Sequence, residues 1–379
     1  MSTQKICIIG NGLAGLSAAA IFGKQNIKID LYASNIKSKK KIDNRTTAIS
    51  ESSYQFIKNK INLKQKKFWP TKEINLFFED KNIIKNFLNF KENKNLMYVF
   101  KNENFRKQLN QNILTNKNIK LIKKNITEID YKNSAVLIGK KNFFYDLIIL
   151  SIGNNAKFYD KIDQARSIKK NYKEVSLTTN IKHDSKINNV SQFFLNHGPL
   201  AILPFAKNKF SVVWSIDVSF FKKNNKLLKK ILVEKITKLL KNIKIKKIEN
   251  IQSFPINLNL KTKYFKKNVL ILGDGLHSVH PMAGQGFNLI LRDIKKLSEL
   301  MKQALKLGLH FNNSFLLKDF YNTRKPENNI LGLGINLTNM FFKNNSYFSP
   351  IRRLILGNIS KFRFIKKISQ IISDKGISA

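Results

Sequence analysis

Two glycine-containing segments carry the residue types best suited to chemistry in this sequence. The first segment holds Gly10, Gly12 and Gly15 as GxGxxG, directly after the apolar run KICII. The first glycine permits a tight turn, the second lets a pyrophosphate approach the backbone, and the third lets helix and strand pack closely. With Leu13 and Ala14 the motif opens an alanine-rich helix, whose free N–H groups would face the phosphates. We therefore predict a dinucleotide site.

The acidic residue that usually follows such a motif is missing. An acid is expected about 20 residues on, at the end of the second strand, where it would bind the ribose hydroxyls. In IKIDLYASN that position is Ala33. Asp30 lies three residues earlier and would point to the opposite face of the strand. Ser34 or Asn35 could donate a substitute hydrogen bond.

The second segment, GDGLHSVHPMAGQGFNL, spans residues 273–289 between the apolar run NVLIL and a long amphipathic pattern. Asp274 follows the strand at the edge where α/β sheets bind their ligands, and it is suited to accept hydrogen bonds from sugar or ribityl hydroxyls. Gly284 and Gly286 open a helix whose N-terminus can face a negative or electron-rich group. The segment therefore predicts a strand-to-helix junction at a ligand.

The two histidines of this segment, His277 and His280, raise the question of a metal site. A zinc site needs three or four protein ligands. The remaining histidines and the single cysteine are scattered along the chain, at His183, His197, His310 and Cys7. We expect no metal, and no GxSxG elbow favours a hydrolase. Both histidines are predicted to shape the junction.

The elements around these motifs alternate between strand and helix. Residues 5–32 read as a βαβ unit, 105–116 as a helix and 143–153 as a buried strand. Between residues 162 and 255, closely spaced strand patterns favour a mixed or antiparallel sheet, interrupted by one long helix over 224–242. After Leu289 the pattern is helical. We predict an α/β fold with a Rossmann-like nucleotide domain, an interleaved mixed or antiparallel sheet domain and a helical C-terminus.

The charge of the chain is extreme but evenly spread. Its 69 Lys and Arg against 24 Asp and Glu give a formal net charge of +45. The basic residues are interleaved with Asn and Ile, the residues of A/T-rich codons, so a solvated basic surface explains them best. No nucleic-acid motif or local basic stripe supports a nucleic-acid partner. Because of its positive charge, we still expect the protein to be attracted to anionic membranes.

The resemblance to a known family becomes clear when the second segment is compared residue by residue. It resembles the third FAD motif of group A flavin monooxygenases with a para-hydroxybenzoate hydroxylase-like fold, specifically the ubiquinone-biosynthesis aromatic-ring hydroxylases, typically GDAAHxxHPxAGQGxNLGxRD. The residues that match are Gly273, Asp274, His277, His280, Pro281, Ala283, Gly284, Gln285, Gly286, Asn288, Leu289, Arg292 and Asp293. The segments DNRTTAIS, GPLAILPFAKNKFSVVWS, SFPINL, FYNTRKPEN and SPIRRLILGNISKFRFIKK extend the resemblance along the chain.

The resemblance implies a reaction and a set of cofactor contacts. FAD would be reduced by NADH or NADPH, react with O₂ to a C4a-hydroperoxide, and transfer oxygen to the ring of a polyprenylated phenol in ubiquinone biosynthesis. The cofactor does this chemistry, so no certain catalytic side chain is expected. The segment facing the flavin would be Pro281, Gly284, Gln285 and Gly286. The cofactor-binding residues would be Gly10, Gly12, Leu13, Ala14, Gly15, Arg45, Arg106, Asp274, Gly286, Phe287 and Asn288.

The predicted domains are discontinuous. We assign residues 1–70, 96–161 and 256–308 to the FAD-binding domain, 71–95 and 162–255 to the substrate-binding sheet domain, and 309–379 to a C-terminal helical segment.

Three positions depart from the family pattern: Gly275, Ile290 and Ile152, the last of which replaces the Asp of an Asp-Gly pair linked to the cofactor. With Ala33, two acids are lost, which puts FAD affinity in question. Two alternatives follow: another FAD-dependent hydroxylase or oxidoreductase of this fold, or a degenerate, non-catalytic scaffold. The ring carbon, the choice between NADH and NADPH and the oligomeric state stay open.

A polyprenyl substrate would require a binding site with apolar walls and a protein surface that contacts lipid. The phenylalanines Phe193, Phe194, Phe205 and Phe210 could line a pocket or simply form core. The basic amphipathic segment 350–372 could lie on a membrane, or dock on the protein's own core or on a partner enzyme of quinone synthesis. With no signal-peptide pattern, no long apolar run and an unpaired cysteine, we expect a cytoplasmic protein, with peripheral attachment to the inner face of the membrane as an option.

Overall fold

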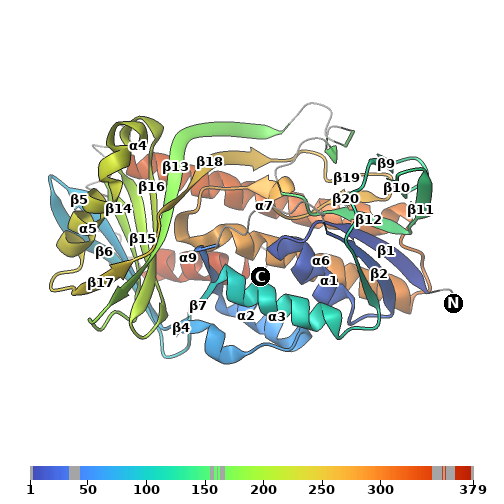
Figure 1. Cartoon of the computed structure of the whole chain (residues 1–379), viewed down its shortest axis with the longest axis horizontal. Helices are drawn as coiled ribbons and strands as arrows, with labels where there is room; N and C mark the ends of the chain where they lie inside the picture. Colours follow the sequence, from blue (N-terminus) through green and yellow to red (C-terminus); the bar gives the residue numbers. More distant parts are fainter. Residues whose placement is uncertain are drawn as a thin grey trace.

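The computed structural model describes residues 3–33, 43–153, 158–159, 161–162, 167–343, 352, 355 and 363–376. Figure 1 shows an elongated molecule with a helix-covered sheet at one end and a larger sheet at the other. The long helices of the C-terminal part run between the two ends. The fold is therefore α/β with two sheet regions, as predicted.

The nucleotide-binding end is built on a six-stranded sheet, in the order β19-β20-β12-β1-β2-β8. All neighbours from β20 to β8 are parallel, and only β19 is antiparallel. The central strands are apolar and buried, as expected where both faces of the sheet are covered. The bounds are β1 (Gln4–Ile9), β2 (Ile27–Tyr32), β8 (Ile119–Ile122), β12 (Leu147–Leu150), β19 (Phe265–Lys266) and β20 (Val269–Ile271).

Helices α1 (Leu13–Phe22) and α3 (Asn102–Leu114) pack against each other, and α1 also contacts the long helix α6 (Gln285–Lys306). The predicted βαβ unit and the helix predicted over 105–116 are thus confirmed as β1-α1-β2 and α3. Two small sheets complete this end. They comprise β9 (Glu128–Asp130), β10 (Ala135–Ile138) and β11 (Lys141–Phe144), and β3 (Thr46–Ser50), β7 (Met97–Lys101) and β4 (Trp69–Thr71).

The larger sheet has nine strands, of which eight follow the order β21-β18-β13-β16-β15-β14-β5-β6, with β17 paired to β13. All pairs are antiparallel except β14 with β5, so the prediction of a mixed sheet is confirmed. The bounds are β5 (Glu73–Asp80), β6 (Ile83–Lys91), β13 (Ile168–His183), β14 (Val190–Leu195), β15 (Gly198–Ala206), β16 (Lys209–Asp217), β17 (Ile245–Ile248), β18 (Gln252–Leu260) and β21 (His277–Ser278). Strand β18 crosses the domain boundary predicted at residue 255.

The helix predicted over 224–242 is shorter than expected. Helix α4 (Val218–Asn224) and a 3₁₀ turn over Asn225–Leu227 precede α5 (Leu228–Leu239). Only Leu228, Leu232 and Ile236 of α5 are buried, one narrow stripe packed on the sheet. The apolar pattern also includes Leu227, directly before α5, but its side chain is 56% exposed. Burial of this residue therefore does not stabilise a longer helix.

The C-terminal part is helical, as predicted. After α6 come α7 (Ser314–Phe342) and α9 (Arg363–Lys375), while α2 (Glu51–Lys60) lies beside α9. None of the helices in the described ranges is long and apolar enough to cross a bilayer.

Candidate cofactor and substrate site

The glycine turn after β1 has the geometry that its sequence requires. Gly10 has a φ of 121°, and a Cβ on it would lie 2.2 Å from the Ser151 carbonyl oxygen. A Cβ on Gly15 would lie 2.1 Å from the Gly10 carbonyl oxygen, so both positions exclude a side chain. A Cβ on Gly12, the N-cap of α1, would meet no atom within 4 Å. Of the three glycines, Gly12 alone faces open space, where a phosphate can approach the helix N-terminus.

Two arginines lie near this turn. Arg106 of α3 donates from Nη1 to the Asn11 carbonyl oxygen at 3.1 Å, directly beside Gly12. Arg45 pairs with Asp43 at 2.8 Å and stacks over the Phe254 ring at 5.0 Å. Burial alone would raise the pKa of Asp43, but the hydrogen bond and charge of Arg45 hold that pKa below its usual value. The Arg45 side chain is therefore held in place where it lines the cavity described below.

Asp274 follows β20 at the start of the 3₁₀ turn Gly273–Gly275. Its carboxylate lines the cavity, and no hydrogen bond reaches it from the part of the chain that the structure describes. Burial raises the pKa of Asp274, opposed by the charges of His277 and Arg45. An acceptor with free lone pairs at this strand end is suited to bind ligand hydroxyls.

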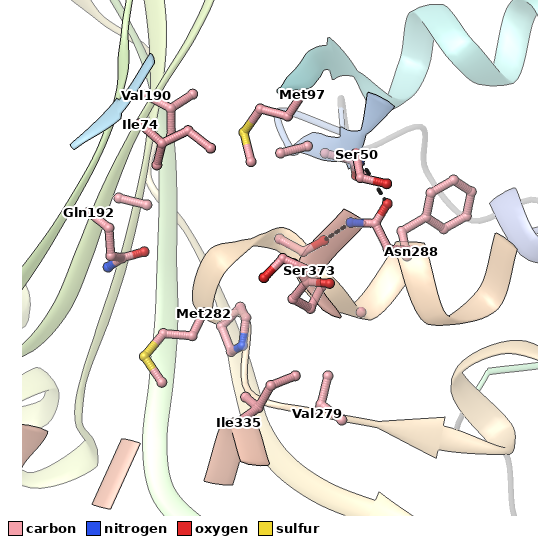
Figure 2. Close-up of a pocket in the computed structure, with 18 of the residues that line it drawn as sticks. Ser50, Ile74, Met97, Val190, Gln192, Val279, Met282, Asn288, Ile335 and Ser373 are labelled. Carbon is pink, nitrogen blue, oxygen red and sulfur yellow. Dashed lines mark hydrogen bonds between the residues drawn. The ribbon is translucent and has the colours of Figure 1, made fainter. Parts of the chain in front are cut away.

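The segment after His280 turns into α6 through Gly284. Gly284 adopts the left-handed conformation, with φ 65°, and a Cβ on it would lie 3.0 Å from the Ala48 Cβ. Asn288, one turn into α6, accepts from the Ser50 N–H at 2.9 Å and donates to the Gly284 carbonyl oxygen at 3.2 Å. Figure 2 shows Asn288 bonded on both sides, between β3 and the turn. The turn is thereby fixed against the cofactor end of the molecule.

A cavity of about 1420 Å³ separates this turn from the large sheet. Pro281, Gly284, Gln285, Gly286, Phe287 and Asn288 line one side together with Asp274 and Arg45. The opposite wall comes from the sheet and includes Ile74, Val190 and Gln192, which Figure 2 shows facing the turn across the open space. Residues of α7 and α9 complete the lining. The predicted flavin-facing residues and the apolar sheet thus share one cavity.

The phenylalanines predicted as pocket walls or core divide between the two roles. Phe194 lines the cavity and stacks on Phe342 at 3.6 Å between ring centroids. Phe193 and Phe210 lie in the core of the sheet, and Phe205 packs on a smaller cluster beside it. Alternation along β14 explains the difference between neighbours, because successive side chains point to opposite faces.

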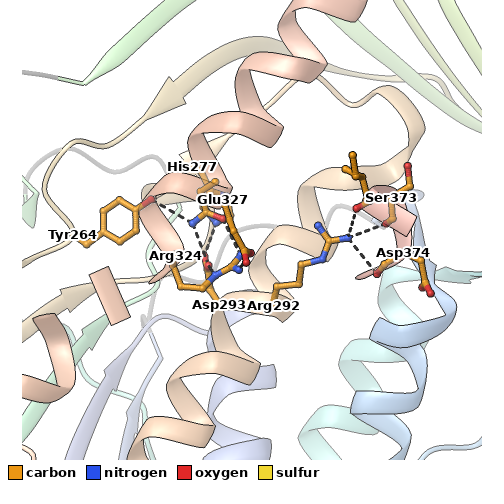
Figure 3. A network of polar contacts seen from close by, with 10 residues as sticks. Tyr264, His277, Arg292, Asp293, Arg324, Glu327, Ser373 and Asp374 are labelled. Carbon is orange, nitrogen blue, oxygen red and sulfur yellow. Dashed lines mark hydrogen bonds and ion pairs between the residues drawn. The ribbon is translucent and has the colours of Figure 1, made fainter. Parts of the chain in front are cut away.

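The two motif histidines are held by carboxylates. His277 Nε2 lies 2.6 Å from Asp293 Oδ2, and Arg324 Nε donates to the other oxygen of Asp293 at 2.7 Å. Asn328 joins this network through Asp293 and Tyr264 (Figure 3). Burial would raise the pKa of Asp293, but Arg324 and His277 hold it below its usual value. Among the described residues no group of three or more potential ligands could hold a metal ion.

The missing acids leave apolar residues at both positions. Ala33 is buried, and Asp30 points away from it, accepting from Tyr145 at 2.8 Å and pairing with Lys5 at 3.0 Å. Ile152 packs against the core of the nucleotide-binding end. Ser34 and Asn35, the suggested substitutes, lie outside the described residues.

The departure at Gly275 has a direct structural cause. A Cβ at this position would lie 2.1 Å from the Tyr159 hydroxyl and 2.8 Å from the Gly153 carbonyl oxygen. Tyr159 donates to that same carbonyl at 2.7 Å. Gly275 therefore lies against Tyr159 and the Gly153 carbonyl, and these contacts leave no room for a side chain at position 275.

One set of contacts at the site could not be predicted from the sequence. Arg292 donates from Nη2 to the carbonyl oxygens of Ile372, Ser373 and Asp374, the last turn of α9 (Figure 3). The Asp374 carboxylate accepts from the Ser52 N–H at the start of α2, at 2.8 Å. This end of the amphipathic segment docks on the protein's own core, while residues 344–351, 353–354 and 356–362 lie outside the described residues. Arg292 matched the family motif, but its partner could not be read from the sequence.

Comparison with known proteins identifies the family. The FAD binding domain model matches residues 152–308, and the model of glucose inhibited division protein A matches residues 5–194. Ubiquinone biosynthesis monooxygenase COQ6 of Dictyostelium discoideum is 26% identical over 459 aligned positions, which cover 96% of this chain and 92% of that protein. The chain is an FAD-dependent monooxygenase and is similar, over nearly its whole length, to a ubiquinone-biosynthesis hydroxylase.

Other members of the hydroxylase family and its fold agree with this assignment. The 3-demethoxyubiquinol 3-hydroxylase of Escherichia coli is 28% identical over 162 positions, 42% of this chain and 41% of that enzyme. The p-nitrophenol 4-monooxygenase PnpA of Pseudomonas putida superposes with a TM-score of 0.77 over the whole of both chains at 13% identity, which shows the shared fold.

The residues of this hydroxylase fit FAD, the cofactor of its family. The open approach at Gly12 suits a pyrophosphate, and Asp274 offers free acceptors for hydroxyls. The buried Ala33 and the partly buried Ile152 are two cofactor positions where the acid typical of the family is missing.

Proposed function

We propose that this hydroxylase inserts one oxygen atom from O₂ into the aromatic ring of a polyprenylated phenol during ubiquinone biosynthesis. The observation that carries the proposal is the single cavity shared by the turn Pro281–Asn288 and the apolar face of the large sheet. Relatives named for ubiquinone biosynthesis support the substrate class. Bound FAD, reduced by NADH or NADPH, would supply the activation of O₂.

The side chains around the cavity have a positioning role in this proposal. The N-terminus of α6, at Gly286 and Phe287, presents backbone N–H groups that favour negative charge on a reduced cofactor. The wall formed by Ile74, Val190 and Phe194 would hold an apolar ligand and keep water from the reacting atoms. No buried acid or base is needed at the ring.

The lining of the cavity favours a substrate with an apolar tail. The cavity, of about 1420 Å³, would hold the flavin end of the cofactor together with the substrate. Its lining continues from the cofactor turn to Leu76, Leu88 and Phe90 of strands β5 and β6. We propose that the phenol ring lies at the turn and that the prenyl tail extends along these strands.

The substrate's chemistry also suggests where the enzyme works. A net charge of +45 favours contact with anionic lipid, and a prenylated phenol resides in membranes. We propose peripheral attachment, with binding to vesicles containing anionic lipid that weakens as salt rises. Equal binding to neutral vesicles, or none at low salt, would contradict it.

Mass spectrometry of quinone intermediates tests the reaction. A strain that lacks the gene should accumulate a prenylated phenol with one hydroxyl fewer, and a plasmid copy should restore the product, whose ring position the same spectra reveal. Normal quinone levels in a strain without a second such hydroxylase would refute the proposed substrate.

The alternative of a non-catalytic scaffold rests on Ala33 and Ile152. Purified protein that carries yellow flavin, bleached when NADH or NADPH is added, would exclude it. Flavin reduction without any oxygenated phenol product would instead favour another oxidoreductase of this fold.

A further inference from the structure

The second motif histidine has a carboxylate partner from the other end of the molecule. His280 Nε2 lies 3.0 Å from Glu174 Oε2, and both side chains are buried, with His280 0% and Glu174 4% exposed. Glu174 belongs to β13 of the large sheet, 106 residues away in sequence. His277, by contrast, is held by Asp293 of the neighbouring helix α6. These side-chain contacts hold the segment to α6 and to the large sheet, which the segment also joins through the pairing of β21 with β18.

A bulge in β13 directs Glu174 toward this contact. The pairing of β13 with β18 shifts register between Asn171 and Glu174, and Lys173 has a φ of 54°, which is uncommon for a residue other than glycine. The Asn171 side chain accepts from the Lys173 N–H at 2.8 Å and holds the bulge. Bulges often redirect a side chain next to a functional site.

A third element meets the same carboxylate. Lys343, the residue that caps the C-terminus of α7, lies 2.6 Å from Glu174 Oε1. Its Nζ is also 3.8 Å from Asp217 of β16, and the Tyr172 ring contacts His280 edge-on at 5.4 Å. The large sheet, the cofactor turn and α7 therefore converge on one buried carboxylate.

The position of His280 gives this contact its consequence. Pro281 follows directly, and the turn to Gly284 and Asn288 forms the cofactor side of the cavity. A buried carboxylate is costly unless it is paired, so Glu174 and His280 are strongly held together. Displacement of His280 would shift the turn relative to the substrate wall, which is built on the same sheet as Glu174.

We propose that Glu174 is a positioning residue, which sets the distance between the cofactor turn and the substrate sheet through His280. The proposal rests on FAD binding by this family and not on the identity of the phenol. It predicts that loss of Glu174 separates cofactor reduction from productive oxygen transfer. More of the NAD(P)H consumed would then yield hydrogen peroxide.

The test compares Glu174→Ala and Glu174→Gln with Asp217→Asn, a control that removes only the distant carboxylate contact of Lys343. Purified FAD-loaded proteins are assayed for bound FAD, flavin absorbance spectrum, thermal midpoint and peroxide released per NAD(P)H. A misplacement of the reacting groups by about 1 Å lowers the productive rate about 100-fold. Glu174→Ala should therefore form product more slowly by about that factor, and its flavin absorbance spectrum should be shifted. Glu174→Gln keeps an acceptor for His280 and should retain more product.

The outcomes separate positioning from simple stability. A lowered thermal midpoint with an unchanged spectrum and unchanged product per NAD(P)H would overturn the proposal. So would an equal effect of Asp217→Asn. If Glu174→Ala does not fold, Lys343→Met provides the test. It removes the cation that pairs with the Glu174 carboxylate, and it should shift the flavin absorbance spectrum in the same direction. The spectrum and FAD content need no phenol, so a wrong substrate assignment would not affect them.

Discussion

At the scale of single residues, one departure from the family pattern, Gly275, is explained by its contacts. Gly275 stands where the family usually has alanine, and the space that an alanine Cβ would need is filled by Tyr159 and the Gly153 carbonyl. Tyr159 is bonded to that carbonyl and buried, so it has little freedom to move away. Alanine, the residue typical of the family, would therefore clash with these groups at position 275.

Gly275→Ala is expected to destabilise the protein by about 1–3 kcal/mol, the usual cost of an overpacked site. In a Tyr159→Ala background the same change should cost less, because the ring that occupies the space is gone. Urea unfolding of the two single variants and the double variant measures the coupling. Costs that simply add would show that Tyr159 does not set the requirement for glycine.

The sequence predicted the local backbone geometry of the two glycine turns. Gly10, Gly15 and Gly284 lie where their motifs placed them, because close backbone approach and a left-handed turn leave their mark on residue type. The partners of Gly275 and His280 could not be predicted. Tyr159 and Glu174 lie more than 100 residues from them, and neither belongs to a motif.

At the scale of elements, α9 is the element whose role the sequence left open. Its last turn is held by Arg292 of α6 and by the hydroxyl and N–H groups of Ser52 at the start of α2. Arg292 is buried, and burial with the nearby Arg324 lowers its pKa to about 10, so it remains charged at neutral pH. A cation at the C-terminal end of a helix is favourable. This end of the helix is a wall of the cavity rather than an external anchor.

Arg292→Met should release this end of α9. The carbonyl oxygens of Ile372, Ser373 and Asp374 would lose a common donor, at a cost of about 1–3 kcal/mol. Limited proteolysis within residues 363–376 should accelerate, and iodide should quench flavin fluorescence more readily. Lys302→Met, which removes an exposed cation of α6 that does not line the cavity, serves as the control. Equal proteolysis of the two variants would contradict the assignment.

At the scale of the whole molecule, the buried ion pairs join parts of the chain that are distant in sequence. Asp293 connects the cofactor segment to α7 through Arg324, and Glu174 connects the large sheet to that segment and to Lys343. Burial would raise the pKa of Glu174, but the hydrogen bonds and charges of His280 and Lys343 hold it below its usual value. The pKa of Asp293 is lowered in the same way.

These lowered pKa values predict a specific acid sensitivity. As the pH falls, the unfolded chain takes up protons on both carboxyl groups before the folded chain does. The contribution of these groups to the free energy of unfolding is therefore complete above the ordinary carboxyl pKa of about 4. It is lost as the pH falls through the lower folded values. Asp293→Asn should therefore be much less stable than the native chain at pH 7 and closer to it at pH 3, as measured by urea unfolding. A constant difference across that range would contradict the prediction, and Asp319→Asn, an exposed change on α7, should match the native chain throughout.

The docking of α9 also has a consequence for the order in which the protein matures. The glycine turn lies at residues 10–15 and the turn into α6 near 284, whereas the wall that Ser373 and Asp374 contribute is synthesised after both. A growing chain can fold the nucleotide sheet only after β20, and it can close the cavity only after α9 has emerged. We therefore expect stable capture of the flavin only after α9 has been made, and a chain cut short before residue 374 should fold in part but leave this side of the cavity open.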